Sequence, residues 1–369
     1  MTKAKLETEL HSGYASFRLC GKVSISEDTF PKEDKKSASG WKYRRSSFPV
    51  KVGDSNLIYV QMMGGRSSDN PVVYVMNKDN KATTINWDLR NNEEVLENIS
   101  PRSFMRFYLE KDESGKLVEK RFISEIDAIE YLSEHLKNDE KVKVNGQIEY
   151  SHYNGQIQRS FNITSISLAK DDDENYAYIQ QTYLADSHAI PRKWEKFLEE
   201  NGEVKLNLYV PQYISKEDGK EVKQTLALPQ VLTIKANGDT ERVKKIVDKY
   251  FTVDKKVVRE LTLQNNVVYG YEKTTGKVKI TEELQDLIDL GLMTEEQIQN
   301  EATISGEKVN ETILDHPIVR MDDNGNTTTL VKDKYAPEAL IISASEESED
   351  EVTEESNEDD PFSDEDLFS

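Results

Sequence analysis

The feature that most constrains the fold is a long alternating segment, residues 141–168, with a turn at its centre. Apolar residues such as Val142, Val144 and Ile148 occupy every second position of its first half, which is the two-residue period of a half-buried strand. Asn154-Gly155 then supplies two residues that accept positive φ, as a tight hairpin turn requires. The segment therefore predicts two long antiparallel strands.

The turn also sets which residues of the two strands face each other, because a two-residue loop fixes the register. The apolar side chains of both strands then share one face. At Thr164-Ser165 the alternation slips, which predicts a β-bulge and a bend. The expected opposite pairs are Tyr150 with Arg159, Ile148 with Phe161, and Gly146 with Ile163.

An amphipathic helix is expected directly before this hairpin. Ser124 followed by Asp127 resembles a capping box at its start. A helix followed by a bent closing hairpin, after earlier strands, is the order of a five-stranded OB barrel. The apolar positions at helical spacing are Ile126, Ile129, Leu132 and Leu136.

The remaining chain predicts a mainly β protein with tandem OB-like barrels and an acidic tail. Residues 17–25 are expected as a first strand, 41–63 as a loop and second strand, and 71–76 with 82–87 as a third strand region. After the acidic run 171–174 the pattern of strands, hairpin and helix repeats. The expected divisions are a flexible N-terminus (1–13), an OB-fold domain (14–170), a second OB-like domain with a helical insertion (175–343) and a disordered tail (344–369).

Charge is segregated along the chain. The net charge is −21, but residues 345–369 hold 13 of the 69 acidic residues and no Lys or Arg. Residues 41–66 hold five basic residues against Asp54 alone. This distribution favours a basic groove and a separate acidic tail.

Aromatic and basic residues interleave in the first half of the chain. Single-stranded nucleic acid binders use cations to follow phosphates and aromatic faces to stack bases. Trp87 and Tyr43 are the expected stacking residues, although any one aromatic side chain could instead fill the core and the basic run could be a solvated loop. The candidate contacts are Trp41, Lys42, Tyr43, Arg44, Arg45, Arg66, Trp87, Arg90, Arg106, Tyr108, Tyr150, Tyr153 and Arg159.

The run VKVNGQIEY…YNGQIQRSFNITSI, with a tail ending DDPFSDEDLFS, resembles the single-stranded DNA-binding proteins of bacteria and their phages. The similarity covers about a tenth of the chain. It implies an OB fold that binds single-stranded DNA without sequence specificity during replication, recombination and repair. It further implies a bacterial cytoplasm, the host's if the chain is phage-encoded, and an acidic tail that recruits replication proteins.

Phenylalanines within the acidic tail fit a partner with an apolar pocket ringed by cations. In the family that the tail resembles, the last residue is Phe, whereas Phe368 here is followed by Ser369, so the identity of the partner is open. A merely solubilising tail is the alternative. The expected partner contacts are Asp359, Asp360, Pro361, Phe362, Asp364, Glu365, Asp366, Leu367 and Phe368.

Motifs of catalysis and metal binding are not found in the sequence. The five His residues are scattered, no Cys pair supports a zinc site, and no phosphate-binding glycine loop occurs. We expect no enzyme activity, no cofactor and no metal. The single Cys20 and the lack of an apolar segment predict a cytoplasmic protein with no membrane partner, either monomer or homodimer.

Two other functions remain open from the sequence. The acidic composition and Asp360-Pro361-Phe362 also fit an interaction protein or a DNA mimic that does not bind nucleic acid. A nuclease subunit with unrecognised carboxylates is the third alternative.

Overall fold

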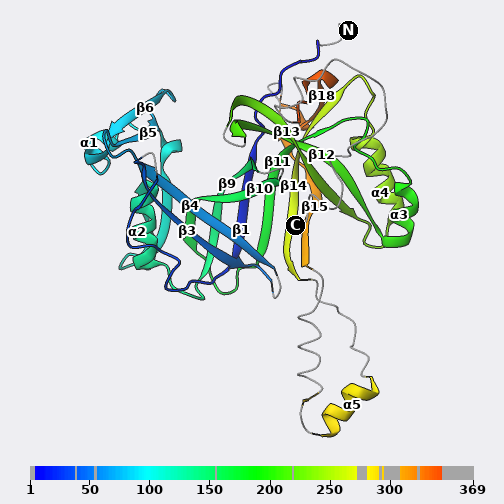
Figure 1. Ribbon diagram of the computed structural model, residues 1–369, viewed down its shortest axis with the longest axis horizontal. Helices are drawn as coiled ribbons and strands as arrows, with labels where there is room; N and C mark the ends of the chain where they lie inside the picture. The colour runs from blue at the N-terminus through cyan, green and yellow to red at the C-terminus, as the bar shows by residue number, and fades with distance from the viewer. Residues whose placement is uncertain are drawn as a thin grey trace.

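The computed structural model describes residues 5–37, 40–53, 56–153, 156–217, 220–271, 281–290, 293–294, 308–321 and 325–342. Over these residues the chain is mainly β, as predicted, and most strands belong to one continuous sheet (Figure 1). The expected turn at Asn154-Gly155 and the tail 344–369 lie outside the described residues.

Five strands of the N-terminal half close into a ring, called the first ring below. Its strands pair in the order β1–β3–β4–β10–β9, and β9 pairs with β1 to close the ring. Within the ring only β4 and β10 pair in parallel. Helix α2 (Glu125–His135) precedes β9, and the Ser124 hydroxyl accepts a hydrogen bond from the Asp127 amide at its start, as predicted. The strands are β1 (Ala15–Val23), β3 (Lys42–Lys51), β4 (Leu57–Arg66), β9 (Lys141–Tyr153) and β10 (Gln156–Leu168).

The β9–β10 hairpin has the predicted register. Tyr150 pairs with Arg159, and the register shifts between Ile163 and Ser165, which confirms the bulge. Gly146 is required at its position, because a Cβ there would collide with the Asn162 carbonyl and approach the Phe17 ring at 2.5 Å.

The region between β4 and α2 differs from the expectation. The stretch 41–63 holds two strands instead of one, β3 and the start of β4. The predicted third strand region does consist of strands, β5 (Val72–Met76) and β6 (Ala82–Asn86), but they form a separate two-stranded sheet outside the first ring. With α1 (Glu93–Leu96) they form an arm, residues 72–103, which has its own small apolar core. Strands β7 (Met105–Lys111) and β8 (Leu117–Phe122) extend the sheet beyond β10.

The C-terminal half repeats the same order of pairing in a second ring. Its neighbours run β11–β12–β13–β15–β14 and back to β11, again with one parallel pair, β13 with β15. The strands are β11 (Tyr176–Ala185), β12 (Glu203–Glu217), β13 (Lys220–Lys235), β14 (Val258–Tyr271) and β15 (Lys308–Pro317). Helix α3 (Trp194–Asn201) lies between β11 and β12 in sequence, and α4 (Thr240–Ile246) between β13 and β14.

Shorter elements complete the chain. Helix α5 (Glu282–Asp289) projects away from the second ring in the segment between β14 and β15 (Figure 1). Strand β18 (Val331–Tyr335) pairs with β14, and a 3-10 turn (Pro337–Ala339) follows it. The remaining pieces are β2 (Lys35–Lys36), which pairs with β3, and a two-stranded sheet of β16 (Val319–Met321) and β17 (Thr327–Thr329).

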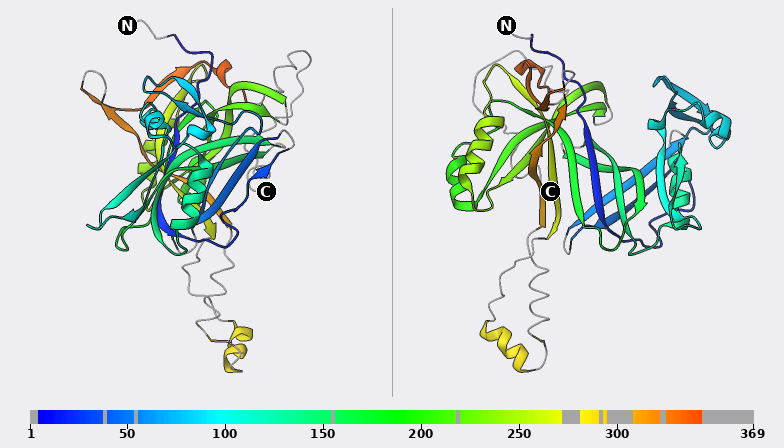
Figure 2. Two further views of the ribbon diagram at one scale, coloured as in Figure 1. Left: turned by 90° about the vertical axis from the view of Figure 1, so that its left-hand side faces the viewer. Right: turned by 180° about the vertical axis from the view of Figure 1, so that it is seen from behind.

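The two rings are joined through their first strands. Strand β1 pairs antiparallel with β11 from Ala15 opposite Gln181 to Cys20 opposite Tyr176. One apolar core runs through both rings, since Phe17 of β1 and Ile179 of β11 belong to the same buried cluster. Figure 2 shows the two rings side by side, with the arm at the outer end of the first. The expected boundary at 171–174 lies between β10 and β11.

Candidate nucleic-acid interface

Strands β3 and β4 expose one face of the first ring, called the outer β3–β4 face below. Phe48, Val50, Val60 and Met62 point into the core, so the alternating residues between them point outward. Tyr59 is 55% exposed on this face. We define the face by its β3 residues Tyr43, Arg45, Ser47, Pro49 and Lys51, its β4 residues Leu57, Tyr59, Gln61, Met63 and Gly65, and the preceding Trp41.

An aromatic pair lies at one end of this face. The rings of Trp41 and Tyr43 stack with centroids 5.2 Å apart and planes inclined by 13°. Gly65 lies opposite Tyr43, and a Cβ there would approach the Trp41 indole at 2.7 Å. The indole therefore lies directly on the backbone of β4, and both aromatic rings remain partly exposed.

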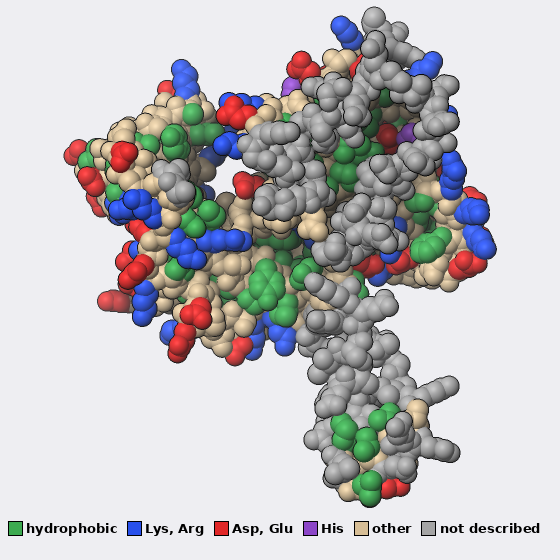
Figure 3. Space-filling view, viewed as in Figure 1, with side chains coloured by type: hydrophobic (Ala, Val, Ile, Leu, Met, Phe, Trp, Pro, Cys, Tyr) green, Lys and Arg blue, Asp and Glu red, His purple; other side chains and the backbone are tan. Residues whose placement is uncertain are grey.

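A chain of side-chain hydrogen bonds crosses the same face. Arg45 Nη2 donates to Gln61 Oε1 at 2.8 Å, and Gln61 Nε2 donates to Asn162 Oδ1 at 3.0 Å. Asn162 Nδ2 in turn donates to Glu149 Oε2 at 2.8 Å. Arg45 is exposed and has five N–H donors, so most of its hydrogen-bonding capacity faces outward. Figure 3 shows Lys and Arg side chains beside an apolar patch over β3 and β4.

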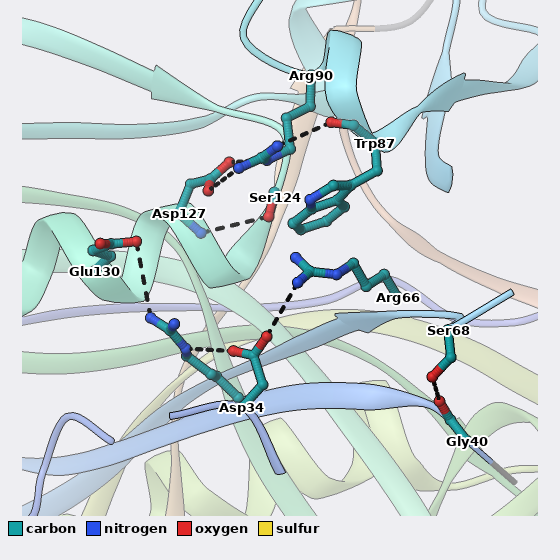
Figure 4. A network of polar contacts seen from close by, with 10 residues as sticks. Asp34, Gly40, Arg66, Ser68, Trp87, Arg90, Ser124, Asp127 and Glu130 are labelled. Atoms are coloured by element: carbon teal, nitrogen blue, oxygen red, sulfur yellow. Dashed lines mark hydrogen bonds and ion pairs between the residues drawn. The ribbon is translucent and has the colours of Figure 1, made fainter. Parts of the chain in front are cut away.

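Four of the predicted phosphate contacts have acidic partners within the protein. One is Arg106, whose Nε lies 3.6 Å from Glu119 Oε1; the other three are Arg44, Arg66 and Arg90. Arg44 Nε lies 2.6 Å from Asp34 Oδ1, and Arg66 Nη2 lies 3.4 Å from the other Asp34 oxygen. Arg90 forms two hydrogen bonds with Asp127, of 2.7 and 3.1 Å (Figure 4). The side chains of these last three pairs are 16 to 24% exposed. The Asp34 pairs hold the loop before β3 against β3 and β4, and the Arg90 pair holds the arm against α2.

Trp87 is also buried and held by contacts within the protein. It is 7% exposed, in the small core of the arm. The guanidinium groups of Arg66 and Arg90 each lie 4.2 Å from its ring centroid, as Figure 4 shows. In this arrangement the indole offers no open face to a base. Its contact with Arg66 fastens the arm to β4, and Arg90, which lies within the arm, links it to α2 through Asp127.

Tyr150 and Arg159 lie at the junction of the two rings and are not among the outward residues of β3 and β4. Tyr150 is 4% exposed and its hydroxyl donates to Gln181 Oε1 at 2.7 Å. Burial raises the pKa of this hydroxyl. Arg159 donates to Thr312 Oγ1 at 3.1 Å and to Asn310 Oδ1 at 3.3 Å in the second ring. Tyr150 therefore fits the alternative of a core aromatic.

Arg106 and Tyr108 lie together on the outward face of β7. Arg106 Nη2 donates to the Pro101 carbonyl at 2.7 Å, and the Tyr108 hydroxyl donates to Glu119 Oε1 at 2.6 Å. The bond to Glu119 raises the pKa of Tyr108. The backbone of Tyr153 pairs with Gln156, while its side chain is outside the described part of the chain. Lys42 is exposed at the end of β3, opposite Arg66.

Sequence reasoning missed three residues of the outer β3–β4 face. Tyr59, Gln61 and Met63 alternate with buried residues along β4, and Met63 lies opposite Arg45. The alternation in LIYVQMM places them on the face that carries Arg45, so the two-residue period could have found them.

The corresponding face of the second ring is covered by the two ends of the described chain. Tyr209 of β12 and Ala227 of β13 are 6% and 0% exposed, in a cluster with Tyr335. The Ala227 amide donates to the Ile341 carbonyl at 2.8 Å, and the Gly13 amide donates to the Pro211 carbonyl at 2.8 Å. The β12–β13 face is therefore closed where the β3–β4 face is open.

Comparisons with known proteins give a distant likeness in structure. No family model matches the chain, and no curated protein matches its sequence. A deletion variant of the single-stranded DNA-binding protein from Thermus aquaticus covers 70% of this chain and 88% of its own, at 8% identity and a TM-score of 0.32. The wild-type form of that protein gives 8% identity, 70% and 87% coverage and a TM-score of 0.29. In the described residues, no helix has the length and apolarity to span a membrane.

Gly65→Ala is expected to displace Trp41 from its position on β4. The added methyl group would collide with the Lys42 carbonyl oxygen and lie 2.7 Å from the indole, so the β3 backbone and the stack with Tyr43 both have to shift. This overpacking should lower the free energy of unfolding by about 1–3 kcal/mol. The indole N–H resonances of the three Trp residues report this displacement. Gly53→Ala is the matched control, because a Cβ there meets its nearest neighbour, Asn56, at an ordinary 3.6 Å. Identical indole spectra for both variants would contradict the arrangement.

Proposed function

We propose that this chain binds single-stranded DNA without sequence preference, on the outer β3–β4 face of the first ring. The observation that carries the proposal is the placement of exposed rings and cations on one open face: Trp41, Tyr43 and Tyr59 beside Arg45 and Lys51. Each stacked base contributes about 1–3 kcal/mol, and stacking tolerates any base because every base has a π-face.

We also infer that the first ring is an OB-type barrel. Its support is the closed five-stranded order with one parallel pair and a helix before the closing hairpin. In OB folds the face of the second and third strands binds oligonucleotides. In the first ring those strands are β3 and β4, the strands that carry the exposed rings.

One consequence concerns the number of binding faces. The second ring has the same order of strand pairing, but its β12–β13 face is packed against residues such as Tyr335 and Ile341. In our proposal each chain therefore offers one strand-binding face, and the second ring supports the first.

Arg45→Ala is expected to weaken binding of oligothymidylate and to reduce its salt dependence. Each neutralised phosphate of a single strand contributes about 0.7 to the slope of log K against log salt. Because Arg45 is the exposed Arg of the outer β3–β4 face, its loss should lower the slope by about that amount. The measurement is a fluorescence titration across a series of salt concentrations.

Lys196→Ala is the matched control for this titration. Lys196 is 72% exposed on α3 of the second ring, where it pairs with Glu200, so its removal changes net charge equally. Its slope should equal that of the unmodified protein. Equal slopes for the unmodified protein and both variants would show that Arg45 does not contact a phosphate of the bound strand.

We further propose that the acidic tail acts in replication, recombination or repair by recruiting a partner protein and by competing with DNA. Its 13 carboxylates are tethered near a cationic face at high effective concentration. Phe362 and Phe368 supply the apolar groups that a partner would bind.

Truncation before Ser345 is expected to tighten binding of single-stranded DNA at low salt more than at high salt, because salt screens the competing carboxylates. Phe362→Ala with Phe368→Ala should leave DNA affinity unchanged and abolish capture of a replication protein from bacterial extract. Titration and pull-down of the intact, truncated and double-Ala proteins test both roles. A truncated chain that binds DNA no better and loses no partner would show that the tail only solubilises.

A further inference from the structure

A cavity of about 330 Å³ lies between the two rings. The first ring lines it with Tyr59 of β4 and with Arg159 and Phe161 of β10. The second ring contributes Tyr269 of β14 together with Asn310 and Thr312 of β15. Figure 1 shows β10, β14 and β15 next to one another at this junction.

The walls of the cavity are held in place by contacts between the rings. Arg159 reaches Thr312 and Asn310, and its guanidinium lies 5.2 Å from the centroid of Phe161. The turn after β3 is bound to the second ring as well, because the Tyr269 amide donates to Asn56 Oδ1 at 2.9 Å and Asn56 Nδ2 donates to the Val267 carbonyl at 3.0 Å. The cavity is therefore a preformed part of the structure, as small-molecule sites usually are.

The charge of the lining suits an anionic or carbonyl-rich ligand. Arg159 is the one charged residue among the described residues that line the cavity, and no carboxylate accompanies it, although the chain as a whole carries −21. Its guanidinium has five N–H donors, and two nitrogens make the bonds to Thr312 and Asn310. Arginine in this setting can donate to a phosphate oxygen or to a base carbonyl.

The cavity is continuous with the outer β3–β4 face. Tyr59 belongs to both, and it is 55% exposed. A strand that stacks on Trp41 and Tyr43 and follows β3 and β4 toward Lys51 and Leu57 arrives at Tyr59. The next nucleotide then lies at the entrance between the rings.

We propose that this cavity binds one nucleotide of the single strand, with its base against Tyr59 and Tyr269 and its phosphate or a base carbonyl at Arg159. The proposal rests on the function proposed above and adds a second, recessed subsite to an open face. Its volume is at the lower end of the range for small-ligand sites, which suits one nucleotide. Amide and hydroxyl groups of Asn310 and Thr312 line the second-ring wall within reach of the ligand.

Photo-crosslinking on the unmodified chain tests this subsite directly. The probes are a series of oligothymidylates of about 20 nucleotides, long enough to pass beyond one OB-type face. Each carries a single 5-iododeoxyuridine, and its position differs from one oligonucleotide to the next. Crosslinked peptides are identified by mass spectrometry. We expect crosslinks at Tyr269, which lies in the cavity and not on the outer β3–β4 face.

Val231→Trp provides the matching affinity measurement. Val231 lines the cavity from β13, so an indole there fills the space without removing Arg159 or its partners. Binding of the same oligonucleotide should become roughly 5- to 100-fold weaker, the effect of losing one stacked base. Circular dichroism checks the fold of the variant, and if it does not fold, the crosslinks on the unmodified chain decide.

The outcomes separate this proposal from the proposed function. If the intact chain does not bind the oligonucleotide, both fail. If it binds, responds to Arg45→Ala, and yet gives no crosslink at Tyr269 and no change with Val231→Trp, the cavity is not a subsite and the outer face acts alone. Crosslinks at Tyr269 that disappear in Val231→Trp establish the subsite.

Discussion

The antiparallel pairing of β1 with β11 is the interaction on which the rest of the structure depends. Each strand closes its own ring on one side and pairs with the other ring over residues 15–20 and 176–181. The pairing provides hydrogen-bond partners for the backbone N–H and C=O groups along strand edges that would otherwise be exposed. It also merges the two cores into one, with Phe17 and Ile179 directly opposite. Two similar rings thereby become one body with a defined junction, and the cavity at that junction follows from it.

The two rings share an order of strand pairing but not a surface. On β12 and β13 the outward residues include Tyr209, Pro211, Ala227 and Pro229, all buried. An apolar face of this kind needs a cover, and residues near both ends of the described chain provide it. On β3 and β4 the outward residues mix aromatic, polar and cationic side chains with a few apolar ones, and none of them is buried. Composition of the outward positions, rather than strand order, thus decides which ring presents an open face.

The sequence predicted local features well and distant contacts poorly. The β9–β10 register and the Ser124 cap depend on neighbours along the chain, and both are confirmed. The partners of Arg44 and Arg90 could not be predicted, because Asp34 meets Arg44 only when the loop folds against β3, and Asp127 meets Arg90 only when the arm folds against α2. Charge pattern alone does not show whether a cation faces solvent or a carboxylate.

Hydroxyl-radical footprinting tests most directly the central proposal, that the open β3–β4 face of the first ring binds the strand and the covered β12–β13 face of the second ring does not. Four exposed side chains of similar accessibility report on the two rings: Tyr59 (55%) and Met63 (44%) on the first, Tyr213 (48%) and Phe197 (41%) on the second. With saturating single-stranded oligonucleotide, oxidation of Tyr59 and Met63 should fall while Tyr213 and Phe197 stay unchanged. Protection of the second-ring pair, or unchanged oxidation of Met63, would contradict the account.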